Sequence, residues 1–137
     1  MARTVRAALL QTDWTGNKAS MLDRHEESVH EAKAAGAQVM CFQELFYGPY
    51  FCQVQDPQYY DYTEAIPDGP TTEELAAHAR RHSMVVIVPV YEREQAGVYY
   101  NTAAVYDSDG AYLGKYRKNH IPHTSRSEEH TSELQSL

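Results

Sequence analysis

The sequence contains few of the residues that several protein classes require. It has two cysteines, Cys41 and Cys52, which are too few for a disulfide framework and lack the spacing of a thiolate metal site. We therefore expect a reducing, cytoplasmic setting. No run approaches the roughly 18 consecutive apolar residues of a membrane span. Residues 1–4 lack the apolar segment of a secretory signal.

Basic residues are also scarce. The sequence holds 12 Lys and Arg against 19 Asp and Glu, for a net charge of −7 at pH 7. Phosphate binding needs clustered basic side chains, and the one dense group, Lys115, Arg117 and Lys118, is too short for that role. We therefore expect a small-molecule partner and neither a nucleic acid nor a membrane. A hydrophobic fraction of 42% in 137 residues suits one domain with a packed core.

Three short apolar runs predict β-strands buried on both faces, at residues 5–10, 37–42 and 84–90. Between Gly16 and Gly36, apolar residues recur every three or four positions, which predicts an amphipathic helix that ends at Gly36. A strand, a helix and a strand of these lengths form a βαβ unit with parallel pairing.

The second half of the sequence predicts another helix and a hairpin. The helix opens at Pro70, carries acidic residues in its first turn, and runs to about His82. Residues 99–106 and 111–116 predict two antiparallel strands joined by a turn. The order of elements predicts an α/β fold with a largely parallel sheet that gains antiparallel strands.

Residues 46–62 form an aromatic segment that Gly and Pro interrupt, which predicts a long loop with a functional role. Four of its tyrosines are candidates for an aromatic pocket wall, although packing of these rings against the domain is the commoner outcome. They are Tyr47, Tyr50, Tyr59 and Tyr60.

Two charged residues stand at strand ends, where α/β folds carry their catalytic residues. Glu44 follows an apolar strand end and precedes Leu45, and burial among apolar neighbours raises a carboxyl pKa toward the range of a general base. A local ion pair or simple solvation is the alternative. Lys118 ends the hairpin, where strand alternation puts Tyr116 and Lys118 on one face and Arg117 on the other.

Four segments together resemble the nitrilase superfamily of carbon-nitrogen hydrolases, over residues 4–123. They are Leu10-Gln11-Thr12, Phe42-Gln43-Glu44-Leu45-Phe46, Tyr100-Asn101-Thr102-Ala103 and Gly114-Lys115-Tyr116-Arg117-Lys118-Asn119-His120-Ile121-Pro122. The resemblance implies the N-terminal, incomplete part of an αββα sandwich. It also implies an enzyme that needs no cofactor or metal and that commonly forms homo-oligomers.

The resemblance further implies a Glu-Lys-Cys catalytic constellation. Glu44 would be its general base, and Lys118 would stabilise the oxyanion. The family's nucleophilic cysteine follows the lysine by several tens of residues, so it is expected beyond this sequence. Neither Cys41, in an apolar strand, nor Cys52, without an adjacent base, is a good substitute. The 137-residue chain is therefore expected to be inactive.

Two subgroups of the superfamily are resembled in different places. Residues 50–56 resemble N-carbamoylputrescine amidases, and residues 117–122 fit β-ureidopropionases equally well. Both hydrolyse an N-carbamoyl group to an amine, carbon dioxide and ammonia, so we expect an N-carbamoyl amine or amino acid as substrate. His120 lies in the second segment and joins the pocket candidates. Paired with His123 and without a third ligand, it does not indicate a metal site.

Residues 126–136 match the in-frame translation of a common DNA-sequencing adapter at all eleven positions. We therefore predict a hydrolase domain portion at 1–123 followed by a non-native tail at 124–137. The alternative is a natural polar tail. In that case the chain would be a truncated paralogue that acts as a non-catalytic binding or regulatory partner.

Overall fold

The computed structural model describes residues 3–50 and 56–121. Five strands form one sheet in the order β1-β2-β3-β4-β5. Their bounds are β1 (Ala7–Leu9), β2 (Val39–Cys41), β3 (Val85–Gln95), β4 (Val98–Tyr106) and β5 (Tyr112–Arg117). Strands β1, β2 and β3 pair in parallel, and β3, β4 and β5 pair antiparallel. The predicted α/β sheet is confirmed.

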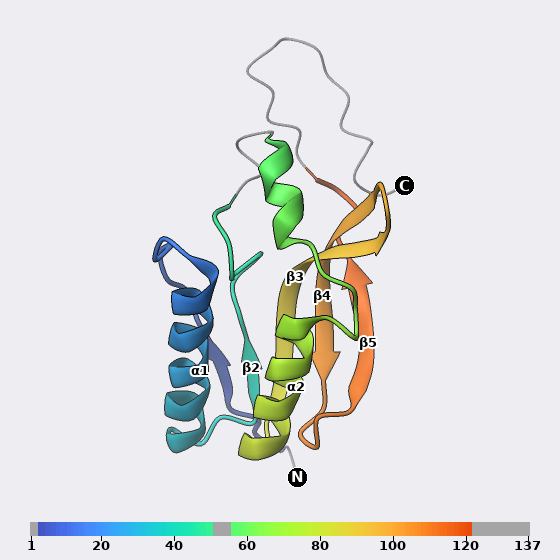
Figure 1. The fold of residues 1–137 in the computed structure, drawn as a ribbon. Coiled ribbons are helices and arrows are strands. Elements are labelled where there is room, and N and C mark those ends of the chain that lie inside the picture. The colour runs from blue at the N-terminus through green and yellow to red at the C-terminus, as the bar shows by residue number, and fades with distance from the viewer. Residues whose placement is uncertain (1–2, 51–55, 122–137) are drawn as a thin grey trace.

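Two helices, α1 (Lys18–Ala34) and α2 (Pro70–His82), lie side by side over one face of this sheet (Figure 1). The side chain of Asn17 caps α1, and Gly36, at φ 81°, follows its end as predicted. The segment expected to be a loop contains a short 3-10 helix, η2 (Pro57–Tyr62). Within the described residues, no helix is both long enough and apolar enough to cross a membrane.

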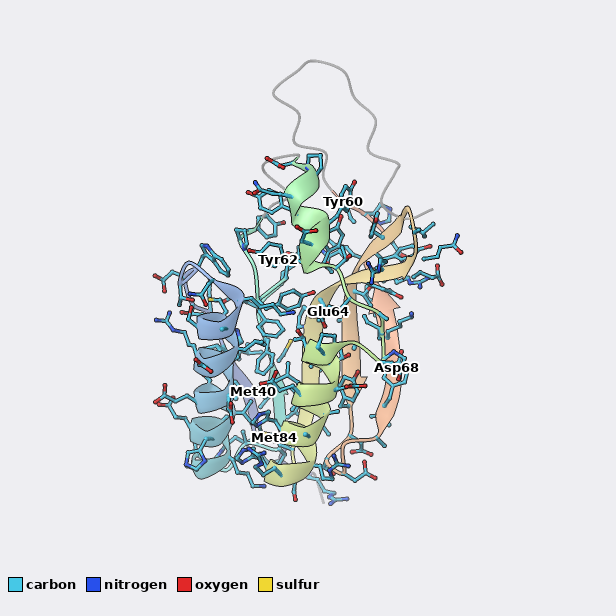
Figure 2. All side chains as sticks on the ribbon, viewed as in Figure 1. Met40, Tyr60, Tyr62, Glu64, Asp68 and Met84 are labelled. Carbon is cyan, nitrogen blue, oxygen red and sulfur yellow. The ribbon has the colours of Figure 1, made fainter. Side chains whose placement is uncertain are left out.

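The core lies between the two helices and the sheet. Alternation along β3 turns Val86, Val88 and Val90 toward the helices, where all three are fully buried. Figure 2 shows Met40 and Met84 in the same layer, and both are buried. Burial of these side chains holds α1 and α2 against the sheet.

The opposite face of the sheet has no covering element among the described residues. On β1, 83% of Leu9 is exposed, and Leu113 and Tyr116 of β5 are exposed as well. The prediction that the first strand is buried on both faces is wrong, because β1 lies at the sheet edge and helices cover only one side. Cys41 and Ile87, which lie in register with Leu9, are half-buried for the same reason.

A buried carboxylate joins the three antiparallel strands. Glu92 of β3 is 1% exposed, and its Oε2 accepts hydrogen bonds from Thr102 Oγ1 (2.7 Å) and Arg117 Nε (2.9 Å). Its Oε1 accepts another from Arg117 Nη2 (2.7 Å), and Lys115 Nζ also donates to it. Burial alone would raise the pKa of Glu92, but these hydrogen bonds outweigh it and lower the pKa to about 2.

We expect Glu92→Gln to lower the free energy of unfolding by about 3 kcal/mol at pH 7, because it leaves Arg117 and Lys115 beside a neutral amide. The contribution of the ionised carboxylate is complete above the ordinary pKa of 4.5 and is lost as the pH falls toward 2. When the pH is lowered from 4.5 toward 2, the free energy of unfolding of the variant should therefore fall less than that of the parent chain. Urea unfolding at pH 7, 4.5 and 3 measures both effects.

The matched control is Glu94→Gln. Glu94 is also an ion-pair partner of Arg117, at 2.9 Å, but it is exposed. Exposed pairs contribute little to stability, so this change should stay within about 0.5 kcal/mol. Equal losses in the two variants would mean that burial of Glu92 does not set its contribution.

Candidate active site

Glu44 lies three residues beyond the end of β2, in a turn that continues to Tyr47. Leu45 has φ 51°, which is uncommon for a residue with a side chain and is found at functional sites. Leu45 and Phe46 are buried in the core, whereas the Glu44 side chain is 39% exposed. The expected burial of Glu44 is therefore wrong, because its apolar neighbours turn into the core and leave the carboxylate outside.

Lys118 directly follows β5, and its backbone N–H donates to the carbonyl oxygen of Asn101 (2.9 Å), which extends the pairing with β4. The preceding residue, Arg117, turns toward the helix-covered face and binds Glu92. The Lys118 side chain thus leaves the strand on the opposite side, as the alternation of side chains predicts.

Glu44 and Lys118 meet although 74 positions separate them in the sequence. Lys118 Nζ donates to Glu44 Oε1 at 2.7 Å, and Asn101 Nδ2 donates to the same oxygen at 2.5 Å. Sequence reasoning singled out the glutamate and the lysine but not Asn101 as a site residue. The signal for Asn101 was its place in the Tyr100 to Ala103 segment, one of the four that carry the family resemblance.

This arrangement combines a proton acceptor with a cation. Two donors on a single oxygen orient the Glu44 carboxylate, and an oriented carboxylate can take a proton from a nearby nucleophile or water. The Lys118 ammonium beside it can stabilise negative charge that develops on a substrate oxygen. The group thus has the parts of an acyl-transfer site apart from a nucleophile.

The other predicted residues lie in different surroundings. Tyr47 is buried in the core rather than placed on a pocket wall, and its hydroxyl donates to the carbonyl oxygen of Tyr62 (2.7 Å). Burial also raises the pKa of the Tyr47 phenol. Tyr50 and His120 are exposed. The exposed Tyr60 stacks on Tyr99, with ring centroids 4.5 Å apart.

The cysteines do not supply the nucleophile within the described residues. Cys41 is half-buried, its thiol donates to the carbonyl oxygen of Phe42 (3.4 Å), and burial raises its pKa. A raised pKa keeps the thiol protonated, which disfavours nucleophilic attack. Cys52 and His123 lie outside the described residues.

The family model for carbon-nitrogen hydrolases matches residues 6–135. The chain belongs to the carbon-nitrogen hydrolase family. The nitrilase-superfamily resemblance drawn from the four sequence segments is thereby confirmed.

Its relatives include several characterised enzyme types. An N-carbamoylputrescine amidase from Solanum lycopersicum is 36% identical over 120 residues, which are 88% of this chain and 40% of that protein. An omega-amidase from Bos taurus is 38% identical over 119 residues, covering 86% of this chain and 41% of the relative. A beta-ureidopropionase from Arabidopsis thaliana is 28% identical over 130 residues, covering 88% of this chain and 32% of that protein.

Among solved structures, a carbon-nitrogen hydrolase from Helicobacter pylori G27 superposes with a TM-score of 0.75 at 30% identity. The match covers 86% of this chain and 40% of the other. The chain therefore has a nitrilase-like α/β fold and spans between 32% and 41% of the length of these relatives.

We expect the Glu44–Lys118 pair to contribute little to folding. Glu44→Gln and Lys118→Met should each change the free energy of unfolding by less than about 1 kcal/mol, because both side chains are partly exposed to water. Urea unfolding at pH 7 alongside Glu92→Gln makes the comparison. Losses as large as that of Glu92→Gln would mean that the pair serves the fold rather than chemistry.

Proposed function

We propose that this chain is part of a thiol-dependent hydrolase that cleaves N-carbamoyl amines or N-carbamoyl amino acids. The observation that carries the proposal is the contact of Glu44 with Lys118 and Asn101 at one carboxylate oxygen. The names of two relatives, an N-carbamoylputrescine amidase and a beta-ureidopropionase, support the substrate class. The complete enzyme is proposed to be a cytoplasmic homo-oligomer that requires no cofactor.

Glu44 is the general base in the proposed reaction. It takes the proton of a cysteine thiol that lies outside the 137 residues, and the thiolate attacks the carbamoyl carbon. Negative charge gathers on the carbonyl oxygen, where Lys118 stabilises it. When the carbon-nitrogen bond breaks, Glu44 returns the proton to the departing ammonia.

Water completes the cycle. Glu44 removes a proton from a water molecule, which attacks the carbamoyl thioester and restores the thiol. The released carbamic acid breaks down to the amine and carbon dioxide. In this scheme Asn101 is a positioning residue, because its amide holds Glu44 Oε1 and leaves the proton transfers to the carboxylate.

In the complete enzyme, we expect Glu44→Gln and Lys118→Met each to lower kcat by about 10²–10⁴-fold, the range for loss of a general base or an oxyanion donor. Asn101→Ala should lower kcat by roughly tenfold, because it loosens a catalytic group without removing it. Ammonia release from N-carbamoylputrescine and N-carbamoyl-β-alanine measures all three. Glu27→Gln, at an exposed position of α1, is the control and should keep full activity. A Glu44→Gln enzyme within twofold of the parent would rule out the base role.

The 137-residue chain by itself is expected to release no ammonia from either substrate, because it lacks a suitable thiolate. Long-read sequencing of the source DNA across the codons for residues 120–126 separates the two origins of the chain. A frame that continues to a second glutamate and a cysteine supports the hydrolase. A genomic stop after Leu137 would favour the non-catalytic partner instead.

A further inference from the structure

The seam between α1 and α2 carries a cluster of three potential metal ligands that the proposed reaction does not use. Glu74 and His78 are four residues apart on α2, so they share one face of that helix. Glu26 faces them from α1. One ligand atom from each residue lies within 4.8 Å of the other two.

His78 is the unusual member of this cluster. It is only 4% exposed, and its Nδ1 has no hydrogen-bond partner among the described residues. Its Nε2 points at Glu26, with 3.4 Å to Oε1. Nε2, and not the unpartnered Nδ1, is therefore the ring nitrogen that faces the carboxylates of the cluster.

A comparison with His25 shows why this cluster points to a ligand. His25 is also buried with one ring nitrogen unpartnered, but its ring packs against Phe42 and Phe46. Burial lowers the pKa of His25, so it is a neutral core residue. His78 instead meets two carboxylates at a seam that opens to solvent, since the side chain of Glu26 is 45% exposed.

We propose that Glu26, Glu74 and His78 bind a divalent transition-metal ion, with zinc the best match, that clamps α1 to α2. An imidazole nitrogen with two carboxylate oxygens is a donor set that zinc accepts, and water would complete the shell. Bonds of about 2.0–2.2 Å put tetrahedral ligand atoms roughly 3.4 Å apart. His78 Nε2 already lies 3.4 Å from Glu26 Oε1, so closing the site requires only a small movement of the carboxylate oxygens. The two glutamates are partly exposed and can make that movement while His78 stays fixed.

Charge also favours a dication at this place. The two carboxylates bring negative charge to the seam, which a dication such as zinc balances. The cation now beside the cluster is Arg81, whose Nη1 lies 3.6 Å from Glu26 Oε1. Arg81 is 63% exposed, so it can swing into water when a metal ion takes its place. The competing view is a plain ion-pair network of Glu26 with His78 and Arg81.

The clamp is separate from the proposed catalytic group. It lies in the helix layer on one face of the sheet, whereas Lys118 leaves β5 on the other face. The proposed ion is therefore structural and takes no part in the proposed reaction. The sequence pattern alone did not indicate this site. The histidines that stood out as potential metal ligands were His120 and His123.

Calorimetric titration of zinc chloride into the EDTA-treated 137-residue chain at pH 7.5 tests the proposal. The test variants are Glu26→Gln and Glu74→Gln, both at solvent-accessible positions, and the matched control is Glu73→Gln in the same turn of α2. Far-UV circular dichroism checks that each variant keeps its helices. Binding of one zinc ion per chain is expected, at least tenfold weaker in both test variants and unchanged in the control.

Thermal unfolding provides an independent measurement. Zinc at 100 times its Kd should raise the Tm of the parent chain by roughly 5–10 °C, because only the folded chain brings the three ligands together. Neither test variant should show this rise. A parent chain that binds no zinc overturns the proposal. So does zinc binding that Glu26→Gln and Glu74→Gln leave unchanged, or that Glu73→Gln weakens equally, since either result would mean binding elsewhere.

Discussion

The buried carboxylate of Glu92 is the constraint on which the arrangement of the hairpin depends. A charge with 1% exposure is tolerated only if donors surround it, and Arg117, Lys115 and Thr102 are those donors. They come from β4 and β5, so the requirement fixes the side of the sheet on which Arg117 lies. Lys118 is then directed to the other side, where it reaches Glu44. A structural ion pair thus positions the candidate site without touching it.

Glu44 and Glu92 have similar partners but different uses. Each accepts hydrogen bonds from at least one cationic side chain and one neutral side chain. The difference lies in exposure, since Glu92 is enclosed while Glu44 is 39% exposed. A carboxylate with a pKa near 2 is a poor proton acceptor at neutral pH, so the role that fits Glu92 is structural. Glu44 is open to a substrate.

Local sequence pattern predicted the fold where local interactions decide it. The bounds of α2 followed from Pro70 and the acidic first turn, and those of the β4–β5 hairpin from alternation and a turn signal. The pattern did not predict which face of an apolar strand is covered by another layer of the structure. For this reason the exposure of Leu9 and of Glu44 was not predicted. The site pair came from the family resemblance, and Asn101 was overlooked because its contact with Glu44 spans 57 positions. Contacts of that kind follow from topology rather than from neighbouring residues.

The adjacency of Arg117 and Lys118 limits how this hairpin can vary. Side chains alternate with a period of two, so a slip of one residue between β4 and β5 would turn Arg117 outward and Lys118 toward the helices. Such a slip would leave buried Glu92 without its hydrogen-bond donors and would also remove the cation beside Glu44. Natural insertions and deletions should therefore be confined to the turn at residues 107–110, outside the paired strands. Any variant of the chain that folds with β5 in register therefore also has Lys118 beside Glu44.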